Sequence, residues 1–406
     1  MNDISQYIRV GTDYYREVYR PLANDVVRCL VPWSRQSIID DFGKSELQKI
    51  AKYNGFCIVP SHSEYKRVIN GFYNRYEPLS YDNTIKGECK TILAFLKHIF
   101  EEQYELGLDY LTILYTRPLQ ILPVLCLVSI DRMTGKTTFL NLLKLLFQCN
   151  MTICNNDDFK SRFNSDMAGR NVIGVDEVML DRKEDSERIK NLSTSLTHKV
   201  EAKGKDKIEL EFFGKIILCS NNEDSFIKID SNEVRYWVRK IKPLPSVNTE
   251  LLDVMRQEIP YFANFLLNRK IKSEKKTRMW FSREEIYTEA LEVLIRGNRT
   301  NFESELEELL KDEFSYFDVP QLQYTSQNLV DMLRKRNVLV GVGNVSNVLQ
   351  NKWKLTPHNS TYKLFRSDCC AFNTPPEFNY TTEKGRYYTF LKQNFIKSVE
   401  NVDKSS

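Results

Sequence analysis

The chain has 406 residues, of which 42% are hydrophobic and 28% charged, as in an ordinary globular protein of two or three domains at roughly 150 residues each. Its net charge of +4 is too small to indicate nucleic-acid binding, so only local clusters of basic residues can argue for it. Nine cysteines without a C-x-x-C pair and only four histidines argue against a zinc site and against histidine-based catalysis. No apolar run approaches the roughly 20 residues of a membrane span, and no signal-peptide core follows Met1, so we expect an intracellular protein without a membrane partner.

Residues 1–105 have mixed patterns and are expected to form an accessory region, either α/β or helical. The stretch from Ile38 to Ile50 looks helical, and two short runs bounded by turn residues, 55–60 and 71–76, predict strands. From Glu88 to Tyr104 apolar residues recur on one side and predict an amphipathic helix. We interpret the aromatic residues of this region as core rather than as a platform for stacking bases.

The central motif of the chain is a strand followed by a polar loop and a helix. Apolar, partly β-branched residues from Val124 to Val128 predict a buried parallel strand. After the loop come Gly135-Lys136-Thr137-Thr138 and a helical pattern from Phe139 to Leu146. This is the arrangement of a phosphate-binding P-loop. One position departs from the G-x-x-x-x-G-K-[ST] pattern, because Ile130 stands where the first glycine is expected.

The physical basis of this motif assigns roles to its residues. Backbone N–H groups at the start of a helix point toward a bound anion, and Lys136 adds a mobile positive charge for the β and γ phosphates. The Thr137 hydroxyl would bind Mg²⁺. We therefore expect ATP and Mg²⁺ as ligands, with the nucleotide contacts made by Thr134, Gly135, Lys136, Thr137 and Thr138.

Two carboxylates follow the next buried strand. The run from Asn171 to Val175 is mostly apolar, and Asp176 and Glu177 come directly after it. Ligands of open α/β sheets bind at the carboxyl ends of the strands. In that position Asp176 would hold the Mg²⁺ shell and contact the nucleotide site, and Glu177 would activate the water that attacks the γ phosphate. The alternative is a pair of solvated acids that opens a loop.

The residues that would complete an ATPase site lie further along the chain. A third buried strand begins at Lys215 and ends in amides, and Asn221 is the candidate for orienting the attacking water. The segment 232–239 carries two arginines that would lie on one side if the segment were helical. An arginine delivered to a neighbouring subunit's γ phosphate is a known catalytic device. We favour Arg235 as this finger and keep Arg239 as the alternative, while either arginine could instead pair with an acid.

The segment from Val200 to Phe212 alternates on both sides of Gly204 and predicts a β-hairpin. Its tip carries Lys203, Lys205 and Lys207. Lysines at a hairpin tip suit contact with a nucleic-acid backbone, because each neutralised phosphate releases counterions. An ordinary edge hairpin kept soluble by its lysines is the alternative.

The last part of the chain predicts a helix from Leu251 to Leu267, a basic run at 270–278 that we interpret as a linker, and a further domain. The helices expected in that domain are Ser282–Arg296, Glu303–Phe314, Ser326–Lys335 and Val345–Trp353. Strand-like runs at 361–365 and 385–390 follow, which gives the order of a winged helix. Lys352, Lys354 and Arg386 would then contact phosphate, although many winged helices mediate only protein contacts.

With these pieces assembled, the chain resembles the superfamily 3 helicases. The likeness is closest to the phage and mobile-element primase-helicase proteins whose helicase part is similar to the poxvirus primase-helicase. It rests on the segments 129–138, 173–177 and 218–222, the Lys203–Lys205 hairpin and the Arg235 segment. Residues 11–15 and 31–33 look like the leading region of the same group.

The resemblance implies an AAA+-type core that assembles as a ring, expected to be a hexamer, and translocates on single-stranded DNA. The hairpin lysines would grip the DNA, and Arg235 would act across the subunit boundary. The resemblance also implies a role in phage or mobile-element replication, in the cytoplasm of a bacterial cell or phage-infected host. Residues 1–105 carry no paired-acid primase motif, so a primase or polymerase is expected to be a separate chain.

We therefore predict an α/β protein with a P-loop NTPase core of the AAA+-like, superfamily 3 type and a winged-helix-like domain. The predicted divisions are an N-terminal collar or accessory region at 1–105, the helicase core at 106–245, a helix and basic linker at 246–279, the winged-helix-like domain at 280–396 and a tail at 397–406. The predicted function is an ATP-dependent DNA helicase. The alternative is a nucleotide-switched DNA-binding initiator or regulator without unwinding activity.

Overall fold

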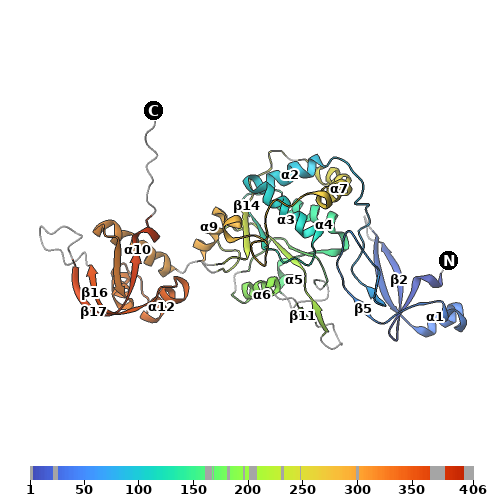
Figure 1. The fold of residues 1–406 in the computed structure, drawn as a ribbon, viewed down its shortest axis with the longest axis horizontal. Coiled ribbons are helices and arrows are strands. Elements are labelled where there is room, and N and C mark those ends of the chain that lie inside the picture. The colour runs from blue at the N-terminus through green and yellow to red at the C-terminus, as the bar shows by residue number, and fades with distance from the viewer. Residues whose placement is uncertain are drawn as a thin grey trace. The chain divides into compact units, whose positions relative to one another are not determined.

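The computed structural model describes residues 3–21, 26–160, 167, 169–180, 183–194, 197–200, 208–229, 233–246, 248–298, 301–365 and 380–396. The chain divides into two compact units, the first made of 1–227 with 234–291 and the second of 228–233 with 292–406. Figure 1 shows the elements of both units, and each unit has a hydrophobic core of its own. No helix in the described ranges is long and apolar enough to cross a membrane.

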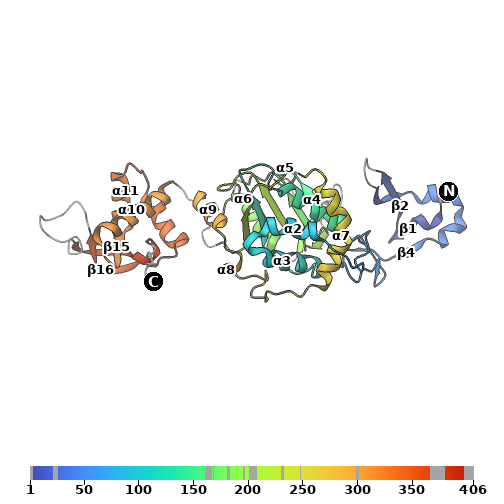
Figure 2. The ribbon, with the colours of Figure 1, turned by 90° about the horizontal axis from the view of Figure 1, so that it is seen from above.

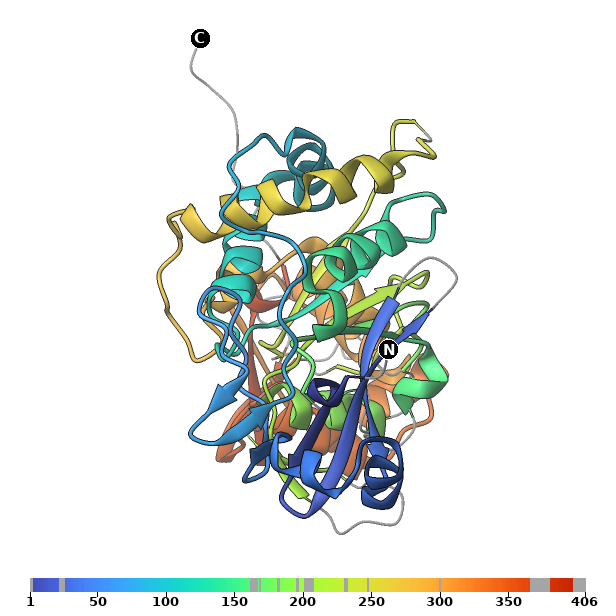
Figure 3. The ribbon, with the colours of Figure 1, turned by 90° about the vertical axis from the view of Figure 1, so that its right-hand side faces the viewer.

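The first unit begins with a sheet coloured dark blue in Figure 3. This sheet has four strands in the order β3-β2-β1-β4. Its strands are β1 (Tyr7–Val10), β2 (Asp13–Pro21), β3 (Val26–Trp33) and β4 (Ala51–Tyr53). Helix α1 (Arg35–Phe42) is capped by the Ser34 hydroxyl, and its Ile38 packs with Tyr7. Against the other residues of β1 lies a small second sheet formed by β5 (Phe56–Cys57), β6 (Val68–Ile69) and β7 (Phe72–Asn74). The region is therefore α/β, one of the two forms expected.

The centre of the first unit is a parallel sheet that lies among the labelled helices α2 to α7 in Figure 2. It has five strands, all parallel, in the order β14-β8-β13-β10-β9. Its strands are β8 (Val124–Val128), β9 (Met151–Cys154), β10 (Val172–Val175), β13 (Lys215–Ser220) and β14 (Tyr236–Lys240). Every residue of β8, β10 and β13 is buried, which is why these strands read as continuous, mostly apolar runs. The strand predicted at 124–128 is confirmed, and those predicted to begin at Asn171 and Lys215 are confirmed with shorter bounds.

Helices cover this parallel sheet. On one face lie α2 (Lys90–Phe100), α3 (Tyr104–Thr116), α4 (Lys136–Phe147) and α7 (Leu251–Asn268), whose apolar residues form one core with the sheet (Figure 1). On the other face lie α5 (Asn156–Lys160) and α6 (Lys183–Thr194). The single helix predicted at 88–104 is interrupted, because the backbone of Glu101 turns with a φ of +41° and ends α2.

The segment 232–239, considered above as a possible helix, leads into a strand instead. Trp237 of β14 is fully buried and stacks on Phe100 with ring centroids 5.3 Å apart. It also approaches the Phe281 ring at 6.3 Å. The spacing of the two arginines is compatible with a helix, but burial of this large aromatic side chain stabilises a strand here.

The predicted hairpin is confirmed as an antiparallel pair of strands, but its first strand lies earlier in the chain than predicted and has only Val200 inside the predicted range. Strand β11 (Thr197–Val200) pairs antiparallel with β12 (Ile208–Glu211), so residues 201–207 connect them. The tip lysines Lys203, Lys205 and Lys207 lie outside the described residues.

The basic run at 270–278, interpreted above as a linker, packs on the core of the first unit. Arg269 pairs with the buried Asp109 of α3. The backbone N–H groups of Lys272 and Ser273 donate to the same carboxylate at 3.1 and 2.6 Å. The chain then rejoins the apolar core at Trp280. Two further helices follow, α8 (Arg283–Ile286) and α9 (Glu289–Gly297).

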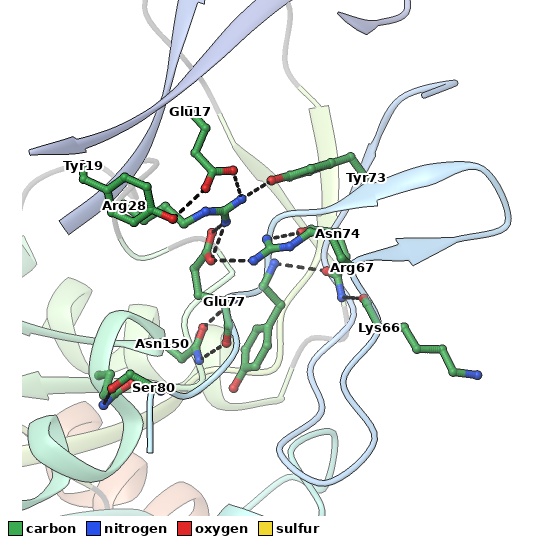
Figure 4. A network of polar contacts seen from close by, with 12 residues as sticks. Glu17, Tyr19, Arg28, Lys66, Arg67, Tyr73, Asn74, Glu77, Ser80 and Asn150 are labelled. Atoms are coloured by element: carbon green, nitrogen blue, oxygen red, sulfur yellow. Dashed lines mark hydrogen bonds and ion pairs between the residues drawn. The ribbon is translucent and has the colours of Figure 1, made fainter. Parts of the chain in front are cut away.

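A polar network joins the N-terminal sheet to the core of the first unit (Figure 4). Arg28 of β3 pairs with Glu17 and donates to Glu77 Oε2 at 2.9 Å. The Glu77 N–H donates to Asn150 Oδ1 at 3.1 Å, and Asn150 Nδ2 donates to the Glu77 carbonyl at 2.8 Å. Because Asn150 follows the end of α4, this network ties the N-terminal sheet to the P-loop helix.

The second unit combines helices with a three-stranded antiparallel sheet in the order β15-β17-β16. Its elements are α10 (Asn301–Phe317), β15 (Gln321–Thr325), α11 (Ser326–Lys335), α12 (Val342–Asn347), the π-helical turn η5 (Val348–Lys352), β16 (His358–Phe365), β17 (Tyr380–Leu391) and the 3₁₀ turn η8 (Lys392–Asn394). The helix predicted at 326–335 is confirmed. Strand β15 is absent from the predicted elements, because only Leu322 and Tyr324 in it are fully buried.

Candidate nucleotide-binding site

The P-loop connects the end of β8 to the start of α4. Gly135 is the residue immediately before α4, and its φ of +94° lies in the left-handed region that favours glycine. A Cβ at this position would lie 3.0 Å from Phe95 Cε2, so space is also tight. The glycine of the Gly-Lys-Thr run is therefore required by both backbone and packing.

Ile130 occupies the position of the missing first glycine. It does not adopt a positive φ, and its side chain is 72% exposed. Its N–H donates to Glu223 Oε1 at 3.1 Å. The left-handed residues of the loop are Met133, with a φ of +57°, and Gly135. Since position 130 needs neither left-handed backbone nor unusual space, an isoleucine fits there.

Lys136 is buried beneath the loop. Its Nζ donates to the Ser129 carbonyl at 3.1 Å and to Thr134 Oγ1 at 3.2 Å. Burial lowers the pKa of Lys136, while Cys219 and Asp176 nearby act in the opposite direction. Both hydrogen-bond partners of the ammonium group are neutral oxygens. Negatively charged phosphate oxygens at the start of α4 would attract the ammonium group more strongly and could replace these partners.

Thr137 and Asp176 come together although they are 39 residues apart in sequence. The Thr137 hydroxyl donates to Asp176 Oδ2 at 2.9 Å, which joins the start of α4 to the end of β10. Thr134 is buried and Thr138 is half-buried on the same turn. No cluster of three metal-ligating His, Cys, Asp or Glu side chains occurs among the described residues.

Glu177 is exposed and has a left-handed backbone, with a φ of +53°. Its N–H donates to Asp176 Oδ1 at 3.1 Å. A non-glycine residue with positive φ is uncommon, and such strain clusters at functional sites. The two acids thus differ: Asp176 is held by two hydrogen bonds, and Glu177 extends into solvent at the same edge of the sheet.

The strand order places Asn221 between the P-loop and the acid pair. Strand β13 lies between β8 and β10, and Asn221 follows its last residue and is exposed. The neighbouring Asn222 side chain is used within its own turn, where it accepts the N–H groups of Asp224 and Ser225 at 3.1 and 2.8 Å. Of the two amides that end this strand, Asn221 is therefore the one placed for a ligand.

The two candidate arginines differ in position. Arg239 is buried in β14 and pairs with Glu102, so it is not placed to act as a finger. Arg235 is half-buried and precedes β14, whose first residue, Tyr236, is paired with Val124 at the start of β8. The P-loop begins at the other end of β8, so Arg235 and the P-loop of the same chain lie at opposite ends of the sheet.

Three residues that the motifs do not include support the loop. Glu223 accepts the Ile130 N–H and pairs with Lys240 at 2.8 Å, and Lys240 lies opposite Val128 at the end of β14. His98 Nε2 of α2 lies 3.1 Å from the Thr134 carbonyl. Each comes from a different element, so no local sequence signal marks the three as a group.

Residues 127–239 match the model of a family of unknown function (DUF5906). This range contains the P-loop, the acid pair, Asn221 and Arg235. No curated protein matches the chain.

The solved structures that resemble this chain include three apo structures of the NrS-1 C-terminal region. The first has a TM-score of 0.65 at 14% identity and covers 94% of this chain and 95% of that chain. The second, an A form, has a TM-score of 0.63 at 14% identity with the same shares covered. The third, also an A form, has a TM-score of 0.62 at 14% identity and covers 93% and 94%. Over nearly its full length this α/β protein, with its five-stranded parallel core, is therefore similar in fold to the C-terminal region of NrS-1.

Proposed function

We propose that this protein is an ATP-dependent DNA helicase of the superfamily 3 type, which forms a ring and translocates on single-stranded DNA. The observation that carries the proposal is the 2.9 Å contact between the Thr137 hydroxyl and Asp176 beside the buried Lys136. Phosphoryl-transfer enzymes of the P-loop class bring a lysine, a hydroxyl and an acid together in this way. A role in phage or mobile-element replication rests on the resemblance of the motifs.

ATP and Mg²⁺ are the ligands that this site would take. Lys136 would bind the β and γ phosphates, and the backbone N–H groups of residues 134–138 would surround them. Thr137 and Asp176 offer hard oxygen ligands of the kind that Mg²⁺ prefers, so they would hold the ion directly or through water. Bound there, the ion would neutralise charge on the phosphate oxygens.

Glu177 would take a proton from the attacking water. Its exposed carboxylate and left-handed backbone at the end of β10 support this assignment. Asn221, at the end of the adjacent β13, would hold the same water by a hydrogen bond. Together they would align the water with the γ phosphate, which is the main task of a protein in phosphoryl transfer.

Arg235 would act on the site of a neighbouring subunit. It precedes β14 while the P-loop follows β8, so the two are separated by the length of a five-residue strand, roughly 16 Å. A ring, which we propose to be a hexamer, would bring Arg235 of one subunit to the γ phosphate bound by the next. The tip lysines Lys203, Lys205 and Lys207 would grip single-stranded DNA through its phosphates.

The second unit is interpreted as a winged-helix domain. Its elements follow the order helix, strand, helix, helix, strand, strand from α10 to β17. In such a domain the second helix after the first strand is the one that enters a DNA groove, and the final hairpin forms the wing. Here these elements are α12 with η5, and β16 with β17.

A DNA-stimulated ATPase assay tests the proposal. Lys136→Ala and Glu177→Gln should each lower turnover by about 100-fold or more, because loss of either role costs roughly 3 kcal/mol of barrier. Lys90→Ala is the matched control, since this exposed lysine of α2 pairs only with the exposed Glu88 in the described ranges. Undiminished turnover in either site variant would contradict the mechanism.

The second unit also favours an alternative, in which nucleotide orders the ring and the protein binds DNA without unwinding it. The observation behind it is that the second unit adds helices and the antiparallel β16–β17 pair to the parallel α/β core, in an order that fits a DNA-binding wing. Strand displacement on a forked duplex with ATP separates the two functions. A helicase releases the displaced strand, whereas an initiator or regulator of this kind binds the fork and leaves it paired.

A further inference from the structure

In the second unit, acidic and basic residues lie in different parts of the sequence. Helix α10 is acidic and carries Glu303, Glu305, Glu307, Glu308, Asp312 and Glu313 against one base, Lys311. Between residues 332 and 391 the described residues include a single acid, Glu383. The bases in that range are Arg334, Lys335, Arg336, Lys352, Lys354, Lys363, Lys384 and Arg386. The later part of this unit is therefore suited to an anionic partner.

The helix formed by α12 and η5 presents a line of amides. Val345, Val348 and Leu349 are buried in the core of the unit. The exposed residues of the same helix include Asn344, Asn347 and Asn351, spaced by three and four positions, which is the spacing of one helical face. This face carries neither a charge nor an aromatic ring.

Polar contacts to α11, β17 and α10 hold this helix in place. Ser346 Oγ donates to Ser326 Oγ of α11 at 2.8 Å, and Gln350 Nε2 donates to the Tyr388 hydroxyl at 2.5 Å. Lys352 pairs with the buried Glu303 of α10. Lys352, predicted above as a phosphate contact, is therefore part of the support of this helix and does not belong to the DNA-contacting residues.

The β16–β17 hairpin presents bases on one face. Arg386 lies opposite Asn359, Lys384 opposite Thr361, and Lys363 opposite Thr382, and all of these residues are exposed. Since residues two apart on a strand share a face, Lys363, Lys384 and Arg386 project to the same side. Lys363 Nζ also lies 4.4 Å from the centre of the Tyr380 ring.

We propose that the amide line and the basic face of the hairpin form one binding surface for duplex DNA. A helix fits the major groove, where asparagine amides pair with base edges, adenine above all. Lys363, Lys384 and Arg386 contact phosphates and set the position on the duplex. A single strand is the poorer fit, because single-strand binders stack bases on exposed aromatic rings. Of the described hairpin tyrosines, Tyr362, Tyr387 and Tyr388 are buried, and the exposed Tyr380 has the Lys363 ammonium group over its ring.

The first test measures duplex binding by the full chain without nucleotide, so its outcome does not depend on ATP hydrolysis. The probes are a labelled A·T-containing duplex of about 20 base pairs and a single strand of equal length, each titrated over a range of salt concentrations. Lys384→Ala/Arg386→Ala should weaken duplex binding at least tenfold and reduce the slope of log K against log salt by about 2, because each neutralised phosphate contributes about 0.9 to that slope. Lys311→Ala of α10 is the matched control and should leave the slope unchanged. An unchanged slope in the double variant overturns the proposal, and so does an equal loss of single-strand and duplex binding in that variant.

The second test separates base contact from phosphate contact. In a selection from randomised duplexes, Asn344→Ala/Asn347→Ala should lose the sequence preference of the wild type while retaining its salt slope. Preference that survives this change overturns the role of the amide line. Lys136→Ala should bind the duplex as the wild type does, so failure of the ATPase proposal and failure of this one give different results.

Discussion

At the scale of single residues, His62 is a buried titratable group away from the nucleotide site. Its Nδ1 lies 2.6 Å from the Tyr115 carbonyl and its Nε2 lies 2.5 Å from the Tyr76 hydroxyl. Burial lowers the pKa of His62 to about 4, and the positive charge of Lys215 acts in the same direction. The imidazole is therefore neutral in the folded protein at neutral pH and joins the N-terminal region to α3.

This pKa predicts how stability depends on pH. In the unfolded chain a histidine takes up its proton near pH 6.5, whereas in the folded protein His62 does so only near pH 4. Between these values the unfolded state binds more protons, so the free energy of unfolding falls as the pH falls, by up to about 3 kcal/mol at pH 4 and below. Above pH 6.5 both states are neutral and His62 makes no contribution to the pH dependence.

Urea unfolding at pH 7, 5.5 and 4 checks this expectation, with His62→Gln as the comparison. Carboxylates titrate in both proteins, so the difference between the two is the quantity to follow. The wild type should lose more stability than His62→Gln between pH 6.5 and pH 4. Parallel losses in the two proteins would show that His62 is not the group responsible.

The residues of the candidate site divide into those that sequence can find and those that it cannot. Lys136, Thr137 and Asp176 are predictable because each sits in a short motif at the end of a buried strand. Glu223 and Lys240 are not, because they meet only through the pairing of β14 with β8 and the turn after β13. Such contacts depend on the strand order, which no single motif encodes.

At the scale of elements, the P-loop turn requires glycine at position 135 but accepts isoleucine at position 130, where the motif has its first glycine. Gly135→Ala should weaken nucleotide binding at least tenfold, because alanine is strained by roughly 1–2 kcal/mol at a φ of +94° and its Cβ would crowd Phe95. Ile130→Gly should bind nucleotide as the wild type does, since Ile130 is exposed and does not have a positive φ. Titration with a fluorescent ATP analogue measures both. Tighter binding by Ile130→Gly would mean that the isoleucine does limit the loop.

The elements that sequence predicts well are those with continuous burial. Strand β8 is predicted with its observed bounds because all five residues are buried. Strand β14 carries two basic residues among its five, and its conformation depends on Trp237 reaching Phe100 and Phe281. The run after α7 looks like a linker because its bases resemble a solvated stretch, and only the fold brings Asp109 to its backbone.

At the scale of the whole molecule, Arg235 lies at the far end of its own sheet, so as the proposed finger it would act on the P-loop of a second copy of the chain. Lys136→Ala and Arg235→Ala should each be inactive alone, the first for want of phosphate binding and the second for want of the finger. Mixed in equal amounts, they should regain about a quarter of wild-type ATPase activity, because that share of sites combines an intact P-loop with an intact neighbouring arginine. Sedimentation of the mixture confirms assembly. An assembled mixture that stays inactive would exclude Arg235 as a residue acting between subunits.

The hydrogen bonds between Glu77 and Asn150 have a mechanical consequence. Helix α4 is a stiff rod of about 18 Å, with Lys136 and Thr137 at its start and Asn150 just past its end. Two reciprocal hydrogen bonds resist both pulling and twisting at that joint, and Arg28 extends the connection to β2 and β3 (Figure 4). An axial displacement of α4 is therefore transmitted to the N-terminal sheet through a linkage separate from the strands of the parallel sheet.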